Sequence, residues 1–366
     1  MILQRYLIRE ILQSTAAVLG VLVLVYASNR FARFLSDAAS GLISGDLIFQ
    51  LLVLKISQNV AVLLPVSLYF GVLIGLGRLY KDSEIVAMLA SGVGVRRILQ
   101  GVVWISMAFA LLTLGMSMYA SPEIATKQAK LLARAKGEAE ISGILPGRFK
   151  ELSGGDRVFY AEELSPDRRT MRNVFVQVRQ PDRQEIAVAQ RAYVLVQGRE
   201  GSRFVVLEDG HRYTGQPGGV NYVITRFEKH AVRIDDPRDD PGYRKLESIP
   251  SLELLQSGLP GYLAELQWRL SLPISVIVLA MLAVPLSRTS PRQGKYAKLF
   301  TAVIIYFIYN NAIGVAQKLV ERGELHPWIG VWPVHVLAAL LALGLIWTQN
   351  SLRWRAVLRP QKPVKE

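Results

Sequence analysis

The chain lacks cysteine altogether and holds only four histidines among its 366 residues. Without cysteine it can form no disulfide bond, no thiolate metal site and no cysteine nucleophile. The histidines show no metal-ligand spacing; they are His211, His230, His326 and His335. We therefore expect this chain to bind no metal ion.

Recognisable catalytic motifs are also absent. The sequence contains no G-x-x-x-x-G-K-[ST] nucleotide loop, no H-E-x-x-H zinc motif and no G-x-S-x-G nucleophile motif. No Asp or Glu lies inside the apolar part of a long hydrophobic segment, which argues against an intramembrane aspartyl protease or a carboxylate proton relay. We expect no catalytic residue and no cofactor on this chain, so a partner must supply the energy for any work.

Long hydrophobic segments dominate what is present. Hydrophobic residues make up 51% of the chain, and the mean hydropathy is +0.26. A helix that crosses a bilayer needs ~20 mostly apolar residues, and six segments meet this requirement: 11–29, 57–77, 99–120, 269–287, 299–317 and 329–348. The first continues into Asn29-Arg30-Phe31 instead of a small-residue cleavage site, so we expect it to be a permanent span.

The basic residues indicate how these spans are oriented. The formal net charge is +14, yet residues 122–262 hold 22 basic and 20 acidic residues, so most of the excess flanks the spans. Lys and Arg occur before span 1, between spans 2 and 3, between spans 4 and 5, and after span 6, whereas segment 36–47 has none. Both termini are therefore predicted to be cytosolic and the long insert extracytosolic. This distribution is typical of a membrane protein and not of a nucleic-acid-binding face.

The insert, residues 122–262, has the pattern of an antiparallel β domain. Polar and apolar residues alternate in five short stretches, separated by turn signals: 157–161, 173–178, 192–196, 203–207 and 221–225. A sandwich, a roll or another antiparallel arrangement fits this spacing. We expect helical connectors at 123–140 and 251–267 and a polar linker at 235–241. The chain then divides into spans 1–3 (1–121), the β domain (122–262) and spans 4–6 (263–366).

A short amphipathic segment lies between spans 2 and 3. Asp82 is a candidate N-cap for it, and three apolar residues share one helical face: Ile85, Met88 and Leu89. One interpretation is an interfacial helix without a partner. The other is a cytosolic knob that docks into a partner protein, where Glu84 pairs with a basic group. The pattern does not separate the two.

Two groups of polar residues in the spans have a structural and a functional interpretation. Arg30 and Arg33 lie one turn apart at the outer end of span 1, where they either snorkel to lipid headgroups or clamp the phosphates of an anionic amphiphile. Span 5 carries a polar group that either bonds to other helices or lines a substrate cavity or gate: Tyr306, Tyr309, Asn310 and Asn311.

Several segments together resemble the LptF/LptG permeases of the lipopolysaccharide export ABC transporter. They are Arg5-Tyr6-Leu7-Ile8-Arg9-Glu10, Leu64-Pro65-Val66-Ser67-Leu68, Gly77-Arg78-Leu79-Tyr80 with Asp82-Ser83-Glu84, Glu265-Leu266-Gln267-Trp268-Arg269, Val284-Pro285-Leu286-Ser287 and Ser290-Pro291-Arg292-Gln293-Gly294. The first and last of these segments, with the Arg30/Arg33 pair, favour the LptF branch over its paralogue LptG.

The resemblance implies a subunit of the Gram-negative inner membrane with six transmembrane helices and an inserted periplasmic β-jellyroll. Its partners would be an LptG-like permease, two LptB-like ATPase subunits that hold ATP and Mg, LptC and the LptA bridge, and its substrate lipopolysaccharide. A membrane-anchored envelope scaffold is the alternative from another class.

The same resemblance assigns roles to individual residues. Glu84 belongs to the coupling helix that meets the ATPase, together with Asp82, Ile85, Met88 and Leu89. Arg30 and Arg33 match basic positions near the lipid phosphates. In the fifth helix only the region corresponds, and within it we choose Tyr306 and Asn310 as substrate-binding residues.

Overall fold

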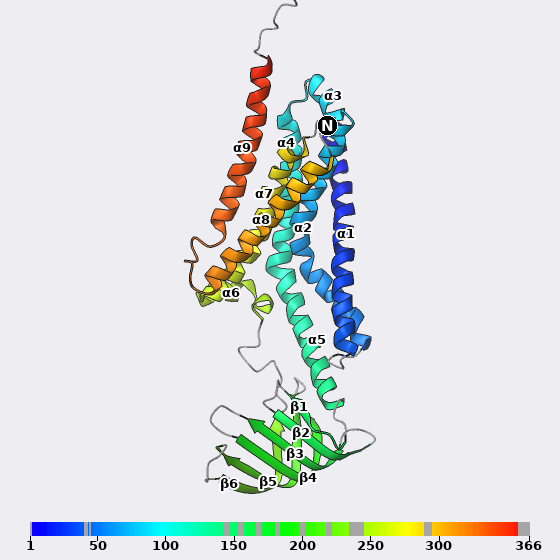
Figure 1. The fold of residues 1–366 in the computed structure, drawn as a ribbon, viewed down its shortest axis with the longest axis vertical. Coiled ribbons are helices and arrows are strands. Elements are labelled where there is room, and N and C mark those ends of the chain that lie inside the picture. Colours follow the sequence, from blue (N-terminus) through cyan, green and yellow to red (C-terminus); the bar gives the residue numbers. More distant parts are fainter. Residues whose placement is uncertain are drawn as a thin grey trace, which may run out of the picture. The chain divides into compact units, whose positions relative to one another are not determined.

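A computed structural model describes residues 2–39, 43, 45–142, 146–152, 157–165, 170–179, 184–197, 202–216, 222–233, 245–288 and 295–357. The expected linker at 235–241, the 290–294 loop and the last basic residues of the tail lie outside these ranges. The described elements are long helices, several short helices and turns, and one β-sheet (Figure 1).

Six helices among the described residues are long and apolar enough to cross a membrane, and each coincides with a predicted span. They are built from α1 (Ile2–Ala39), α2 (Ile48–Lys81), α4 (Val95–Gly115), α7 (Pro260–Ser287), α8 (Lys295–Glu321) and α9 (Trp332–Val357). A π-helical turn at Met116–Ala120 joins α4 to α5 (Ser121–Ser142), so the third span continues as one helix beyond its apolar part. The predicted six-span architecture is confirmed.

The residues fall into two compact units. One consists of Met1–Arg30, Leu52–Lys127 and Lys245–Glu366, and the other of Phe31–Leu51 and Gln128–Arg244. The boundary therefore runs through α1, α2 and α5. In the second unit the ends of these helices share a small apolar cluster around Ile43, Ile48 and Leu51.

The core of the first unit forms around α7, the most buried of its spans. Leu68, Tyr69 and Val72 of α2 belong to this core together with Leu279 and Ala283 of α7. α7 also packs against α4, α8 and α9. These apolar contacts between helices leave the outer faces of α1, α8 and α9 exposed, as expected for helices that face lipid.

A pair of glycines lets α1 and α2 pack closely. A Cβ atom added at Gly71 would lie 2.7 Å from the Cα of Thr15, and one at Gly75 would lie 3.5 Å from the Cα of Ile11. Small residues at i and i+4 permit this approach of two backbones in membrane helices. α1 is therefore fixed against α2 along its first half.

The β domain is a single antiparallel sheet whose described strands pair in sequence order. Its strands are β1 (Lys150–Leu152), β2 (Arg157–Leu164), β3 (Thr170–Arg179), β4 (Gln184–Gln197), β5 (Ser202–Gly215) and β6 (Tyr222–Arg233). The five predicted stretches lie in β2 to β6, with the last starting one residue later than expected. β1 is too short to show alternation, so the sequence did not reveal it.

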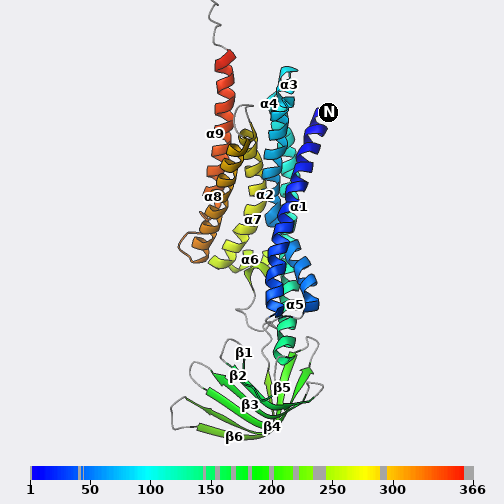
Figure 2. The ribbon, with the colours of Figure 1, turned by 45° about the vertical axis from the view of Figure 1, so that its right-hand side comes forward.

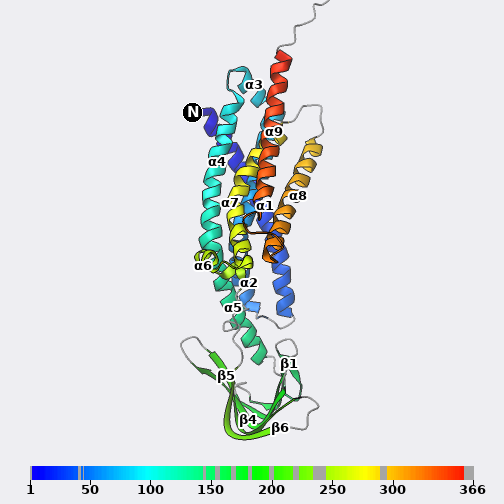
Figure 3. The ribbon, with the colours of Figure 1, turned by 90° about the vertical axis from the view of Figure 1, so that its left-hand side faces the viewer.

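The sheet is strongly curved (Figure 3), and its register shows where it bends. Regular pairing is interrupted at one level in every strand from β2 to β6, and resumes beyond it with the same register. The interrupted residues are Glu162, Asn173, Gln190, Asp209 and Glu228. Asn173 and Asp209 have φ angles of 49° and 54°, which these two residue types tolerate better than most. At this level two successive residues of a strand face outward, as Arg172 and Asn173 do in β3. The alternation of buried and exposed residues changes phase there, and the strands bend, as they do at a β-bulge.

Apolar side chains gather on one face on both sides of this bend. Ala161, Val174 and Ala189 lie beside it on one side, and Met171 and Leu207 belong to the same buried cluster on the other. The opposite face carries charged cross-strand pairs. In one of them the Lys229 ammonium lies 3.0 Å from Glu208, and this contact raises the pKa of Lys229.

Candidate functional site

The short helix α3 (Glu84–Ala90) lies between the second and third spans, as the amphipathic segment predicts. Its N-cap is Ser83, with a left-handed φ of 60° and no capping side chain. The prediction that Asp82 caps this helix is wrong, because the Asp82 N–H still donates to the carbonyl of Arg78 at the end of α2. The Asp82 carboxylate lies 4.0 Å from the Arg78 guanidinium.

The apolar face of α3 packs into the chain's own core. Ile85 and Met88 are buried, as their shared helical face predicts, and Leu89 is half-buried beside the core. Val86, on another face, is 55% exposed. The apolar residues therefore fix α3 against the rest of the chain, and Val86 lies on its exposed side.

Glu84 is held in place by α1. The Tyr6 hydroxyl donates a hydrogen bond of 2.8 Å to Glu84 Oε2. One turn further along α1, the buried carboxylate of Glu10 pairs with Arg78 at 2.9 Å. These contacts join α1, α2 and α3 at this end of the bundle, so Glu84 has a fixed position at the start of α3.

Arg30 and Arg33 lie on the same helix but in different surroundings. The Arg30 Nε donates to the Tyr26 hydroxyl at 3.1 Å, and its guanidinium lies 5.3 Å from the centre of the Tyr26 ring. Arg33 is exposed. Both interpretations of this pair, snorkelling and phosphate binding, remain predictions.

Three polar residues of the fifth span, Tyr306, Tyr309 and Asn310, lie beside one recess. Tyr306 and Asn310 line this small recess between α2, α7 and α8, which also includes Pro65 and Trp268. Tyr306 is half-buried and stacks on Tyr69, with ring centres 6.2 Å apart. The structure therefore places both chosen residues beside one opening.

Tyr309 lines the same recess and also joins three helices. Its hydroxyl donates to Ser275 Oγ of α7 at 2.8 Å and lies 2.8 Å from His335 Nδ1 of α9. All three side chains are buried. Such hydrogen bonds between helices are the structural role considered for this group, and for Tyr309 that role is confirmed.

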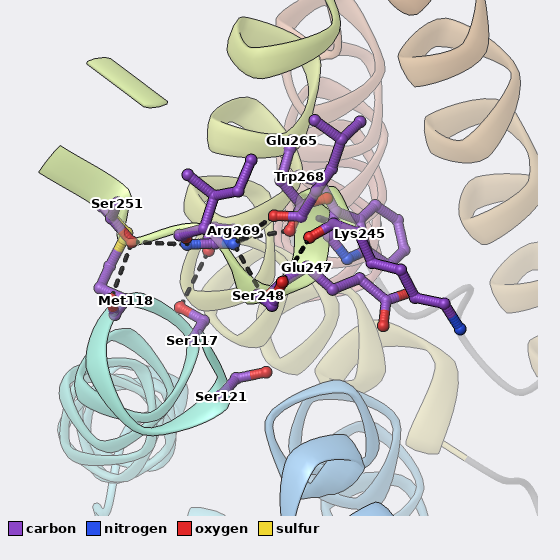
Figure 4. Close-up of polar contacts among 12 residues, drawn as sticks. Ser117, Met118, Ser121, Lys245, Glu247, Ser248, Ser251, Glu265, Trp268 and Arg269 are labelled. Carbon is purple, nitrogen blue, oxygen red and sulfur yellow. Dashed lines mark hydrogen bonds and ion pairs between the residues drawn. The ribbon is translucent and has the colours of Figure 1, made fainter. Parts of the chain in front are cut away.

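A buried arginine that the sequence-based choice of site residues missed organises the start of α7 (Figure 4). The Arg269 Nε donates to Glu265 at 2.9 Å, one turn earlier on the same helix. Its remaining N–H groups donate to the Ser251 hydroxyl and to the carbonyls of Leu246, Glu247 and Ile249, at 2.8–3.2 Å. All five donors of the guanidinium are satisfied, which is what allows the charge to be buried.

The Arg269 contacts hold a connecting segment against α7. That segment contains a 3₁₀ turn, Leu246–Ser248, and α6 (Ser251–Ser257). Ser251 Oγ also donates to the carbonyl of Met118 in the π-helical turn, at 2.7 Å, and Ser117 Oγ donates to the Arg269 carbonyl at 3.0 Å. The available sequence signal was Glu265 and Arg269, an i, i+4 ion pair at the edge of an apolar segment, where charge is costly.

Comparisons with known proteins agree with this arrangement. The model of the family "Lipopolysaccharide export system permease LptF/LptG" matches residues 5–348. The LptF protein of Escherichia coli K12 is 29% identical over 363 residues, which covers 96% of this chain and 97% of the relative. The LptF protein of Shigella flexneri is similar to the same extent. The matched region contains all six spans and the inserted sheet, and the chain therefore belongs to the LptF/LptG family of lipopolysaccharide export permeases.

Proposed function

We propose that this chain is the LptF-type permease of an ATP-driven lipopolysaccharide exporter. The observation that carries the proposal is the end-to-end likeness to LptF relatives, which spans both groups of helices and the β insert. In this role the chain extracts lipopolysaccharide from the inner membrane and passes it to a periplasmic β-sheet bridge. The termini are cytosolic and the sheet periplasmic, in accordance with the positions of the basic residues.

The proposed complex contains an LptG-like permease, two LptB-like ATPase subunits, LptC and LptA. ATP and Mg are bound by the ATPase, and this chain contributes transport and not hydrolysis. Glu84 and the exposed side of α3 contact the ATPase and transmit its motion to the spans. The hydrogen bond from Tyr6 supports this role, because it connects Glu84 to α1. Arg30 and Arg33 attract the lipid phosphates, and Tyr306 and Asn310 line the lipid path beside α8.

Replacement of Glu84 tests this assignment. We expect Glu84→Ala to weaken binding of the ATPase roughly 30-fold or more, and Glu84→Lys to weaken it further, because a buried charge pair at an interface loses one partner. Affinity is measured by titrating the ATPase onto the permease pair in nanodiscs. The matched control is Glu324→Ala. The side chain of Glu324 lies after α8 and is 56% exposed.

Two outcomes would contradict the proposal. If Glu84→Lys binds the ATPase as tightly as the unchanged chain and releases lipopolysaccharide at the same rate, Glu84 does not couple the two proteins. If the chain purifies from its native membrane without a stoichiometric ATPase, the membrane-anchored scaffold is the better interpretation. Mass spectrometry of the purified complex distinguishes an LptF-type from an LptG-type subunit by its partner.

A further inference from the structure

Helix α6 has one side in the core and another that no described residue covers. Leu254 is fully buried in a cluster with Ile249 and Leu266. Leu252 and Leu255, one turn apart on another face, are 67% and 61% exposed. The helix ends at Gly258, whose φ is 66°. α6 therefore carries leucine on its exposed side as well as on its buried side.

The length of α7 locates α6 along the membrane normal. α7 has 28 residues, which gives it a length of ~42 Å, whereas a hydrocarbon core of ~30 Å takes only ~20 residues. We take Ser287, which precedes the basic Arg288, as the inner edge of the hydrocarbon core. Since the core takes ~20 residues, its outer edge falls at about Trp268. The next residue is Arg269, whose guanidinium binds the segment that leads into α6. α6 therefore lies at the outer edge of the hydrocarbon core.

The direction of α6 fits this level. Figures 1, 2 and 3 all show α6 running across the end of α7 and not along it. The turn between α8 and α9 lies at the same level, because Gln267 Nε2 donates to the carbonyl of Pro327. The next residue, Trp328, is 85% exposed, and exposed tryptophan is typical of a membrane–water interface.

From these positions we propose that α6 is an interfacial helix, which inserts Leu252 and Leu255 into the boundary between headgroups and acyl chains of the outer leaflet. Lipid is the occupant because the exposed leucines continue the lipid-facing surface of the spans at the depth where that surface ends. The consequence is that the described segment 245–257, which leads into the fourth span, is attached to the membrane surface. Arg269 holds it on the side of α7, and the two leucines hold it on the side of the lipid.

The absence of cysteine from the chain makes a depth measurement direct. Leu252→Cys and Leu255→Cys are labelled with a nitroxide in the full permease complex in nanodiscs. Collision rates with oxygen, which partitions into lipid, and with a nickel chelate, which stays in water, are then measured by EPR. Leu337→Cys on α9, also 67% exposed in the unchanged chain, is the matched lipid reference, and Gln190→Cys on the sheet is the water reference.

We expect both α6 labels to favour oxygen over the nickel chelate, at a depth between the two references. Nickel accessibility equal to that of Gln190→Cys would overturn the proposal in favour of a water-exposed face. Low accessibility to both reagents would overturn it in favour of a protein partner that covers α6. Leu259→Cys, which follows the helix and is 56% exposed in the unchanged chain, replaces either variant that does not assemble.

Discussion

At the scale of single residues, the contact between Tyr6 and Glu84 links the first span to the helix that we propose meets the ATPase. The hydroxyl of Tyr6 fixes a side chain that would otherwise sample several rotamers. Binding then orders fewer groups, and the entropy lost on association is smaller. Tyr6 is in this sense a positioning residue for Glu84.

We expect Tyr6→Phe to weaken ATPase binding about 5-fold, equivalent to about 1 kcal/mol, the usual net value of one hydrogen bond. The aromatic ring and its packing remain, so the thermal stability of the permease should change little. The informative measurement is a double-mutant cycle of ATPase affinity with Glu84→Gln. If Tyr6→Phe causes the same loss in the Glu84→Gln background, Tyr6 does not act through Glu84.

At the scale of elements, the segment from Lys245 to Ser257 has little regular structure of its own to hold it. One short 3₁₀ turn and a seven-residue helix make few internal hydrogen bonds, so their position depends on contacts with α7. Arg269 provides four of its donors to this segment and one to Glu265. The guanidinium matches these acceptors in a way that an ammonium group, with three donors, does not.

We therefore expect Arg269→Lys to loosen this segment while α7 itself stays helical. Loss of the hydrogen bonds around a buried charge costs roughly 3 kcal/mol. Hydrogen exchange of the backbone amides of 246–257 should therefore accelerate roughly 100-fold. Arg322→Lys is the control, because its ion pair with Glu324 is long and exposed and should contribute almost nothing. Unchanged exchange in 246–257 would show that apolar packing alone holds the segment.

These elements also show which parts of the fold the sequence predicts. Spans and long strands are set by runs and alternation of apolar residues, and their positions agree with the structure. The periodicity of α3 predicts that it has an apolar face. It does not predict that this face packs on the chain's own core, because the same pattern would also fit contact with a partner protein. Arg269 and the bend through Asn173 and Asp209 depend on residues brought together by folding, which a linear pattern does not contain.

At the scale of the whole molecule, the two compact units differ in what stabilises them. The first unit is held by contacts between helices around α7. The second unit is held mainly by the cross-strand pairs of the sheet and the buried cluster at its bend. Since their cores consist of different residues, damage to one core should affect the other unit little.

Gly210 is the position at which this independence can be measured. A Cβ atom there would lie 2.6 Å from the ring of Phe227, its partner on β6, and would also contact the carbonyl of Val188 on β4. Gly215 and Tyr222 repeat the arrangement, with the aromatic ring covering the glycine. The ring could move, but a backbone carbonyl within the sheet cannot move without loss of its pairing.

We expect Gly210→Val to destabilise the sheet by about 1–3 kcal/mol, the usual effect of overpacking a well-packed core. Hydrogen exchange should accelerate in β4, β5 and β6 but not in α7 or α8, and ATPase binding should be retained while delivery of lipopolysaccharide to the bridge falls. Gly20→Ala on α1, where a Cβ would contact nothing within 4 Å, is the control and should change neither. Equal acceleration in the spans and the sheet would mean that the two units unfold as one, and the sheet would then support the membrane helices as well as the lipid path.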